Sequence, residues 1–421
     1  MERIPLAIVG CGGMGHRHLF GLAELHRAGL SPFEIVAACD PVTDNAESLA
    51  QEAEKLLGTR PAVEADISQL GKHGVAAVDI TTTPRYHHNL AVTALENGWH
   101  AMIEKPVALT VRACNLIRNA AAKNNQIVSV AENYRRDPIN RLGKALLDAG
   151  AIGTPRFMLH NTAGGSNLMT ISVWRHQKDQ SGVLLDVGVH FADIMEYYLG
   201  DIDTIYAQVR LHEPIRYNPA ADGGENASNP AGVYGRWQRQ MPAQFEATAE
   251  DAAYATLTFK SGVVAQYLEE HSAHGKGMWI REIHGSRGSM ELPRDRSGNP
   301  LKLLIERNEV VEGEALLDMV PDFRLDKATA TLFGGERLWR YEQPFEETDR
   351  KLLAVEYADF GGAILGEHPI EVDITQGTRS VAVSYGILES GVAGRPVTMD
   401  EMLNEEISAY QREIDEGMGI A

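Results

Sequence analysis

Over roughly the first 135 residues, short apolar runs alternate with longer segments whose apolar residues recur at helical spacing. Such runs are typical of strands buried on both faces, and the longer segments are typical of helices with one buried face. The predicted strands lie at 4–10, 33–39, 75–80, 100–106 and 126–132, and the predicted helices at 14–28, 43–57, 86–97 and 110–123. This repeated strand–helix–strand order predicts an α/β fold with a doubly wound parallel sheet and helices on both faces.

The rhythm changes beyond this part of the chain. Strand-like runs follow one another directly, separated by tight turns such as "KSG" at 260–262 and "GSRG" at 285–288. This pattern predicts antiparallel neighbours. Helices are predicted near 138–149, 182–199, 347–365 and 373–390. We therefore expect a Rossmann domain over 1–133 and an α+β domain over 134–421, whose last helices could return to the first domain.

The turn after the first strand is rich in glycine, in the stretch "AIVGCGGMGHRH" at 7–18. In the pattern Gly-x-Gly-x-x-Gly, the first glycine makes a tight turn, the second lets the backbone approach a pyrophosphate, and the third lets helix and strand pack closely. The N-terminus of the following helix offers unpaired N–H groups to the phosphates. The residues expected to bind a dinucleotide are Gly10, Gly12, Gly13, Met14 and Gly15.

Asp40 ends the second predicted strand, where an acidic residue is expected to accept the hydroxyls of the adenosine ribose. Its charge would repel a 2′-phosphate, and no Arg or Lys follows closely, so the sequence favours NAD over NADP. The distance from Gly15 to Asp40 is longer than the usual spacing of about 20 residues because of an added loop at 27–33. A flavin-binding or nucleotide-free Rossmann domain is the alternative.

Two further groups of polar residues are candidates for chemistry. Lys105, in the tripeptide at 104–106, follows a strand whose carboxyl end should line the ligand crevice, and a surface lysine in a turn is an equally reasonable interpretation. Asp186, His190 and Asp193 lie four and three residues apart in an apolar predicted helix and would share one face. Polar groups there need partners or a purpose, and a structural His–Asp hydrogen bond would suffice.

The stretch 211–250 is rich in Pro, Gly and Asn and is longer than a loop that only connects two elements of a compact domain. It is either a lid or pocket wall, or else a surface excursion or subunit contact. The side chains that a pocket wall would present are Arg216, Tyr217, Tyr234, Arg236 and Trp237.

Charge and cysteine content exclude several classes of protein. With Lys+Arg 39 against Asp+Glu 58, the formal net charge is −19, which argues against nucleic acid or anionic membranes as partners. Three cysteines without a CxxC pair predict neither a disulfide framework nor a thiolate metal site, and we expect no metal. The short apolar N-terminus is no signal peptide, and no apolar run could span a bilayer, so a cytoplasmic protein is expected.

Several motifs occur together in a fixed order: "AIVGCGGMG", Asp40, "TTTPRYHHNLAVTALENGWHAMIEKP", "ENYRRDPINRLGKALLDAGAIGTPRF", "SGVLLDVGVHFADIMEYYLG" and "GVAGRPVT". In this order and spacing they resemble the Gfo/Idh/MocA family of oxidoreductases. The similarity covers nearly the whole chain, apart from 211–250 and about 307–345.

The resemblance implies a Rossmann domain followed by a domain with an open, mostly antiparallel sheet, commonly used for packing into dimers or tetramers. It implies that Lys105, Asp186 and His190 match the catalytic positions, and that the nicotinamide half of NAD is contacted by the segment holding Thr82, Thr83, Pro84 and His87, together with Glu104 and Lys105. Two departures are the "SGV" at 181–183, where many members have three glycines, and the short spacing from Pro84 to His87.

These residues suit the oxidation of a secondary alcohol. His190 could act as the base, Asp186 could orient the imidazole or the substrate, and Lys105 could stabilise the developing alkoxide. Further pocket candidates, for which a structural role is as reasonable, are Arg135, Trp174, Arg175 and His176.

The resemblance implies that the substrate is a carbohydrate, either a sugar, a glycoside oxidised at C3, or a cyclic polyol. The polar and aromatic segment "SVWRHQ" at 172–177 supports this expectation. One alternative is an NAD-dependent glycosidase that uses transient oxidation and elimination. Another is a non-catalytic regulator that binds NAD and sugar.

Overall fold

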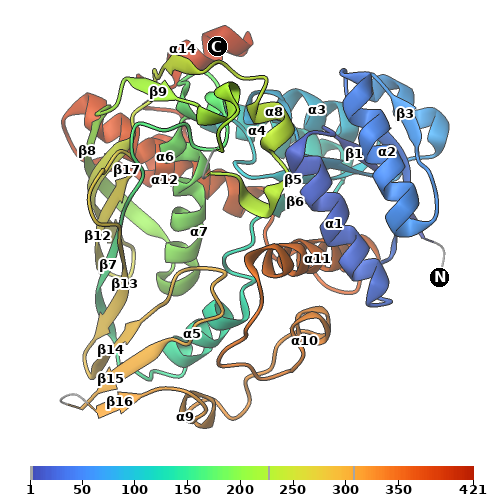
Figure 1. The fold of residues 1–421 in the computed structure, drawn as a ribbon. Coiled ribbons are helices and arrows are strands. Elements are labelled where there is room, and N and C mark those ends of the chain that lie inside the picture. Colours follow the sequence, from blue (N-terminus) through green and yellow to red (C-terminus); the bar gives the residue numbers. More distant parts are fainter. Residues whose placement is uncertain (1–2, 226–227, 307–308) are drawn as a thin grey trace.

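The apolar runs of the N-terminal part form a six-stranded sheet with the order β3-β2-β1-β4-β5-β6, and every neighbouring pair in it is parallel (Figure 1). This computed structural model describes residues 3–225, 228–306 and 309–421. The strands are β1 (Ile4–Val9), β2 (Phe33–Cys39), β3 (Ala62–Glu64), β4 (Ala77–Ile80), β5 (His100–Glu104) and β6 (Val128–Ala131). The predicted parallel sheet is confirmed, and β3 is an added edge strand too short and too exposed to give an apolar run.

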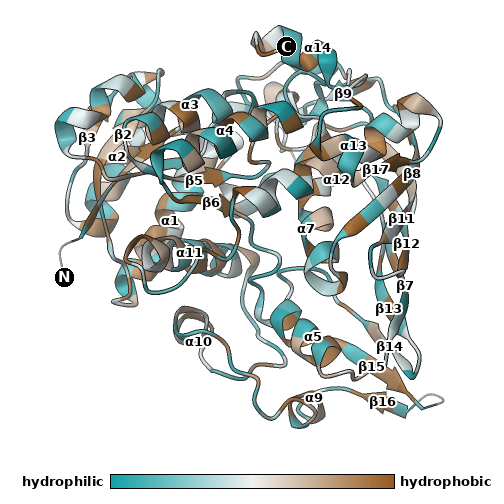
Figure 2. Ribbon diagram, turned by 180° about the vertical axis from the view of Figure 1, so that it is seen from behind, coloured by the Kyte–Doolittle hydropathy of each residue, from teal (hydrophilic) through white to brown (hydrophobic). Residues whose placement is uncertain are grey.

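Four helices cover this sheet: α1 (Gly13–Arg27), α2 (Thr43–Leu57), α3 (Pro84–Glu96) and α4 (Val111–Asn124). α1 packs beside α2 and α3 beside α4, one pair on each face. Hydrophilic and hydrophobic residues alternate along α3 and α4, as expected for helices with one buried face (Figure 2). The predicted doubly wound arrangement is therefore confirmed.

The C-terminal part is built on a nine-stranded sheet with the order β16-β15-β14-β13-β7-β12-β11-β8-β17. Its neighbours are antiparallel except for β7 and β12, which run parallel, so the predicted mostly antiparallel sheet is confirmed. The strands are β7 (Pro155–Ala163), β8 (Ile202–Arg210), β11 (Ala252–Phe259), β12 (Val264–Glu270), β13 (Met278–Gly285), β14 (Gly288–Glu291), β15 (Lys302–Ile305), β16 (Glu309–Val311) and β17 (Val397–Thr398).

The stretch 211–250 has structure of its own. It holds a small antiparallel pair, β9 (Ile215–Tyr217) and β10 (Gln244–Glu246), the 3-10 turns η3 (Pro219–Asp222) and η4 (Pro230–Gly232), and a short helix, α8 (Gly235–Gln238). Residues 226–227 of this stretch lie outside the described residues.

The remaining helices are α5 (Pro138–Asp148), α6 (Val183–Asp186), α7 (Gly188–Leu199), α9 (Ala315–Asp318), α10 (Lys327–Phe333), α11 (Phe345–Ile364), α12 (Ile374–Ala393), α13 (Met399–Leu403) and α14 (Arg412–Met418). Two further 3-10 turns are η1 (Ile67–His73) and η2 (Val173–His176). Within the described part of the chain, no helix combines the length and the apolar character needed to cross a membrane.

The prediction of a single helix over 182–199 is wrong, because the chain forms two helices, α6 and α7, that are separated at Val187. The carbonyl of Asp186, which would normally accept the N–H of His190, accepts instead from Lys105 Nζ at 3.0 Å. The His190 N–H turns to the carbonyl of Val187 at 3.1 Å. A contact from another part of the chain therefore breaks the helical hydrogen-bond pattern.

α11 returns to the N-terminal sheet and packs along α1 (Figure 1). Arg17 on α1 donates from Nε to Asp349 Oδ2 on α11 at 2.9 Å, and both residues are buried. About two helical turns beyond Asp349 on α11, the Tyr357 hydroxyl donates to the buried carboxylate of Asp79 at 2.5 Å. The last quarter of the chain thus completes the core of the first sheet.

Asp349→Ala would leave the Arg17 guanidinium buried without its main partner. Removing one member of a buried ion pair costs about 3–5 kcal/mol of unfolding free energy, and denaturant unfolding measures the loss. Arg27→Ala is the matched control, because Arg27 lies on the same helix in an exposed pair with Glu24 and should change stability little. Equal effects of the two substitutions would contradict this account.

Candidate active site

The turn between β1 and α1 requires glycine at the first and third of its motif positions and leaves open space at the second. Gly10 has φ +101°, and a Cβ there would lie 2.7 Å from the backbone nitrogen of Thr82. A Cβ at Gly15 would overlap the carbonyl oxygen of Gly10. At Gly12, by contrast, no atom lies within 4 Å of a Cβ, so the backbone faces open space there. This is the arrangement in which a pyrophosphate can approach the backbone.

The groups around this turn fit a dinucleotide. α1 starts at Gly13 with no side-chain cap at Gly12, so its first N–H groups are available to an anion. Asp40, at the end of β2, accepts the N–H of Cys11 and the N–H of Val42, each at 2.8 Å. These two bonds fix its carboxylate at the edge of the cleft while leaving further lone pairs for ribose hydroxyls.

A cleft of about 380 Å³ runs along this edge, over the carboxyl ends of β1, β2, β4 and β5. The predicted coenzyme residues that line it are Gly10, Gly12, Gly13, Met14, Asp40, Thr82, Thr83, Pro84, Glu104 and Lys105. Two others lie behind its wall. Gly15 packs against Gly10, and the two ring nitrogens of the buried His87 lie 2.9 and 3.0 Å from the carbonyl oxygens of Pro106 and Thr82.

Lys105 and Asp186 meet in this cleft. Lys105 Nζ donates to Asp186 Oδ1 at 2.9 Å, and Arg175 Nε donates to Asp186 Oδ2 at 2.7 Å. Burial alone would raise the pKa of Asp186, but the charges of Arg175 and Lys105 lower it below its usual value. Asp186 is therefore a fixed carboxylate that holds both cations in place.

His190 is held by Glu132, a residue that the sequence motifs did not single out. The imidazole Nδ1 lies 2.7 and 2.8 Å from the two oxygens of the Glu132 carboxyl, and the ring stacks on Tyr134 with centroids 4.2 Å apart. Burial, and then the charge of Lys105, lowers the pKa of His190 well below its usual value. Burial also raises the pKa of Glu132 to about 7. Asp186, which was considered as a partner for this imidazole, bonds to Lys105 and Arg175 instead.

One sequence signal could have pointed to Glu132. It directly follows β6, and the carboxyl ends of parallel strands line the same crevice edge that places Lys105 after β5. A carboxylate at that position is a candidate site residue by the same rule.

The other pocket candidates divide into two groups. Trp174 and Arg175 line the cleft, with the guanidinium 4.0 Å from the centroid of the indole ring. Arg135 and His176 lie behind it. Arg135 donates from Nε to Asp193 at 2.8 Å, and His176 is buried and accepts the Thr170 N–H at 2.9 Å. Burial lowers the pKa of His176 to about 3.

The stretch 211–250 contributes part of the cleft wall. Tyr234 and Trp237 line it, and the exposed Arg236 bonds to α2. Arg216 is buried in an ion pair with Asp251 at 2.7 Å, and Tyr217 is 42% exposed. Only some of the predicted wall residues therefore face the cleft.

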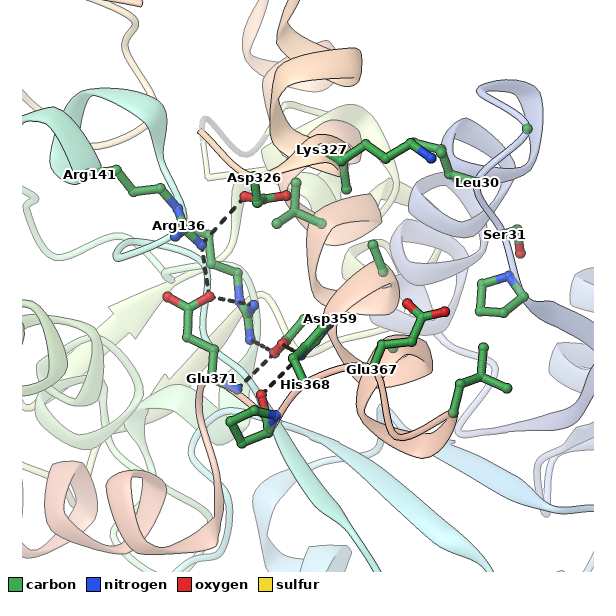
Figure 3. A pocket seen from close by; sticks show the side chains of 18 of the residues that line it. Leu30, Ser31, Arg136, Arg141, Asp326, Lys327, Asp359, Glu367, His368 and Glu371 are labelled. Carbon is green, nitrogen blue, oxygen red and sulfur yellow. Dashed lines mark hydrogen bonds and ion pairs between the residues drawn. The ribbon is translucent and has the colours of Figure 1, made fainter. Parts of the chain in front are cut away.

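A larger cavity of about 640 Å³ lies beneath α11 (Figure 3). Its buried Arg136 pairs with Asp359 at 2.9 Å and with Glu371 at 3.1 Å, and Arg141 pairs with Glu371 at 2.8 Å. The guanidinium groups of Arg136 and Arg141 are thus already paired with carboxylates of the same cavity. The smaller cleft is the candidate active site because it joins the glycine turn to Lys105 and Asp186.

Comparison with known families agrees with this geometry. Residues 4–132 match the model of an oxidoreductase family with an NAD-binding Rossmann fold, and residues 141–291 match the GFO/IDH/MocA C-terminal domain. The chain belongs to the GFO/IDH/MocA family. It is therefore an oxidoreductase, and its N-terminal part is an NAD-binding Rossmann domain.

Relatives in the GFO/IDH/MocA family are named for sugars and polyols. Levoglucosan dehydrogenase of Pseudarthrobacter phenanthrenivorans is 27% identical over 309 residues, which cover 70% of this chain and 75% of that one. D-apiose dehydrogenase of Paraburkholderia graminis is 25% identical, covering 70% and 69%. The scyllo-inositol 2-dehydrogenase (NAD(+)) of Bacillus subtilis is 27% identical, covering 52% and 59%.

Solved structures share the GFO/IDH/MocA fold. A levoglucosan dehydrogenase in complex with NADH has a TM-score of 0.73 at 22% identity, covering 94% of this chain and 99% of that one. An oxidoreductase domain protein from Kribbella flavida has a TM-score of 0.74 at 22% identity, covering 95% and 100%.

Asp40→Ala should weaken NAD binding by about 10- to 100-fold, because charge-assisted hydrogen bonds to the ribose hydroxyls would be lost. Titration of NADH fluorescence measures the Kd. The Kd of Asp40→Asn, which retains one acceptor oxygen, should lie between those of the unsubstituted protein and Asp40→Ala. Glu54→Ala removes a carboxylate from the exposed face of α2 and serves as the control. An unchanged Kd in Asp40→Ala would remove Asp40 from the coenzyme site.

Proposed function

We propose that this protein oxidises a secondary hydroxyl of a sugar, glycoside or cyclic polyol, with NAD as the hydride acceptor. The observation that carries the proposal is the Lys105–Asp186 ion pair at the coenzyme cleft. His190 lies just behind the cleft, bonded to Glu132, and Glu132 lines a small cavity together with Lys105. An ammonium and a neutral imidazole at one place are what alcohol oxidation requires. The names of the GFO/IDH/MocA relatives support the substrate class.

Lys105 binds the substrate oxygen and stabilises the negative charge that develops on it. Asp186 fixes the direction of this ammonium by accepting one of its hydrogens. Because Arg175 shares the same carboxylate, the three groups together carry a net positive charge, which favours an alkoxide over a neutral hydroxyl.

His190 takes the hydroxyl proton at Nε2. The Glu132 carboxylate accepts from Nδ1, so the Nδ1–H tautomer is favoured and Nε2 is left as the proton acceptor. Bound NAD supplies the hydride acceptor. Trp174 offers an apolar face on which sugar C–H groups can pack, and Arg175 beside it can donate to hydroxyls. We favour a glycoside oxidised at its C3 hydroxyl.

The test incubates the purified protein with NAD and a panel of levoglucosan, D-apiose, inositols and aryl glycosides, and follows NADH and released aglycone together. NADH without aglycone supports the proposal. Aglycone without NADH indicates a redox-neutral glycosidase. If neither forms while sugars still raise the melting temperature, the protein binds sugar without turnover.

Lys105→Ala and His190→Ala should each lower kcat by about 100-fold or more, because one removes the stabilising charge and the other the base. Steady-state rates with the best panel substrate measure this, and NADH titration checks that coenzyme binding is largely kept. Full activity in either variant would contradict the assigned roles.

Glu132→Gln should change the pH dependence of oxidation. In the unsubstituted protein, kcat/KM should rise with pH as the Glu132 carboxyl, whose pKa burial raises to about 7, loses its proton. The protonated acid would donate to Nδ1 and leave the hydrogen on Nε2, which cannot then accept a proton. In the Gln variant this inflection should disappear and the rate should fall by about 100-fold.

Asp193→Asn is the control for this profile. Asp193 is also a buried carboxyl with a pKa that burial raises to about 6, but it bonds to Arg135 and not to the imidazole. Its replacement should leave the inflection of Glu132 in place. A Glu132→Gln profile identical to that of the unsubstituted protein would show that Glu132 has only a structural role.

A further inference from the structure

The outer wall of the coenzyme cleft comes from the C-terminal part of the chain. The ring of Tyr234 lies against Gly13, so close that a Cβ on Gly13 would be 2.5 Å from its Cδ1. Arg17 Nη1 donates to the Tyr234 hydroxyl at 3.3 Å. Tyr234 therefore stands beside the open backbone at Gly12, where a pyrophosphate is expected to bind.

Trp237 lines the same cleft near Asp40, where the adenosine half of the coenzyme is expected to bind. Its indole Nε1 donates to Asn45 Oδ1 at 3.3 Å, and its ring meets His16 edge-on with centroids 6.0 Å apart. The neighbouring Arg236 donates to Ser48 Oγ and to Asn45 Oδ1, each at 3.1 Å. These contacts attach α8 to α1 and α2 of the Rossmann domain, beside which it lies in Figure 1.

The base of this segment is held more firmly than its tip. Asn218 and Gln238 are buried, with Asn218 Nδ2 donating to the Gln238 carbonyl at 2.8 Å and Gln238 Nε2 donating to the Ile171 carbonyl at 3.0 Å. At the tip, Arg236 is exposed, and hydrogen bonds that water can reach are easily exchanged for bonds to solvent. The segment is thus anchored to the C-terminal part by buried hydrogen bonds, whereas the bonds of Arg236 to the Rossmann domain are exposed to solvent.

We propose that residues 229–241 form a clasp over bound coenzyme, in which Tyr234 covers the pyrophosphate and Trp237 the adenosine half. Coenzyme then leaves only after the contacts to α1 and α2 break, so the clasp sets the rate of coenzyme release. The groups that act on the substrate, Lys105 and Asp186, lie at the other end of the cleft and are not held by the clasp. This inference rests on NAD binding in this cleft.

The experiment measures NADH release by stopped flow, with excess NAD as the displacing ligand. Tyr234→Ala and Trp237→Ala should each raise koff by about 10-fold or more, because changes at a preformed contact act mainly on dissociation. Tyr234→Phe keeps the ring and should raise koff much less than Tyr234→Ala.

Tyr217→Ala is the matched control, because Tyr217 is an exposed aromatic residue of the same stretch that does not line the cleft. Its koff should equal that of the unsubstituted protein. Thermal unfolding without coenzyme checks that all variants fold.

Release rates within about twofold of the unsubstituted protein in both alanine variants would overturn the clasp. That failure differs from failure of the proposed function, in which the unsubstituted protein would bind NADH normally but oxidise no carbohydrate of the panel. A protein that binds no NADH would fail both.

Discussion

The ion pair between Lys105 and Asp186 is the constraint on which the rest of the site depends. Lys105 begins the loop after β5 of the parallel sheet, and Asp186 ends α6 in the C-terminal part, so the pair joins the two halves of the molecule at the cleft. The same ammonium also takes the main-chain carbonyl of Asp186, and this second bond interrupts the helix at Val187. Because of that interruption, Asp186 turns to the two cations while His190, only four residues later, bonds to Glu132.

Burial gives these groups their chemical character. Loss of solvent, and then the charge of Lys105, lowers the pKa of His190 and keeps its imidazole neutral and able to accept a proton. The same loss of solvent raises the pKa of Glu132 to about 7. The pair formed by Glu132 and His190 can therefore hold or release one proton near neutral pH. Neither property belongs to a residue by itself, and each comes from the packing around it.

Much of the fold could be predicted from the sequence, since a strand buried on both faces leaves an apolar run and a half-buried helix leaves a period. The glycine turn, Asp40 and Lys105 could be placed because each follows a strand of the parallel sheet. The Glu132–His190 contact joins residues 58 positions apart, and the helix break depends on the bond between Asp186 and a lysine 81 positions before it. Contacts of this range leave no periodic trace in the sequence, and the same holds for Tyr234 against Gly13.

The return of α11 to α1 has a consequence for how the chain is made. Arg17 emerges from the ribosome 332 residues before its partner Asp349. At about 5–20 residues per second, that interval lasts roughly twenty seconds to one minute. Throughout it, the nascent first sheet lacks the helix that covers α1, and the surface that will become core is open to chaperones or to other unfinished chains. The assembly of the coenzyme half is therefore completed only near the end of translation.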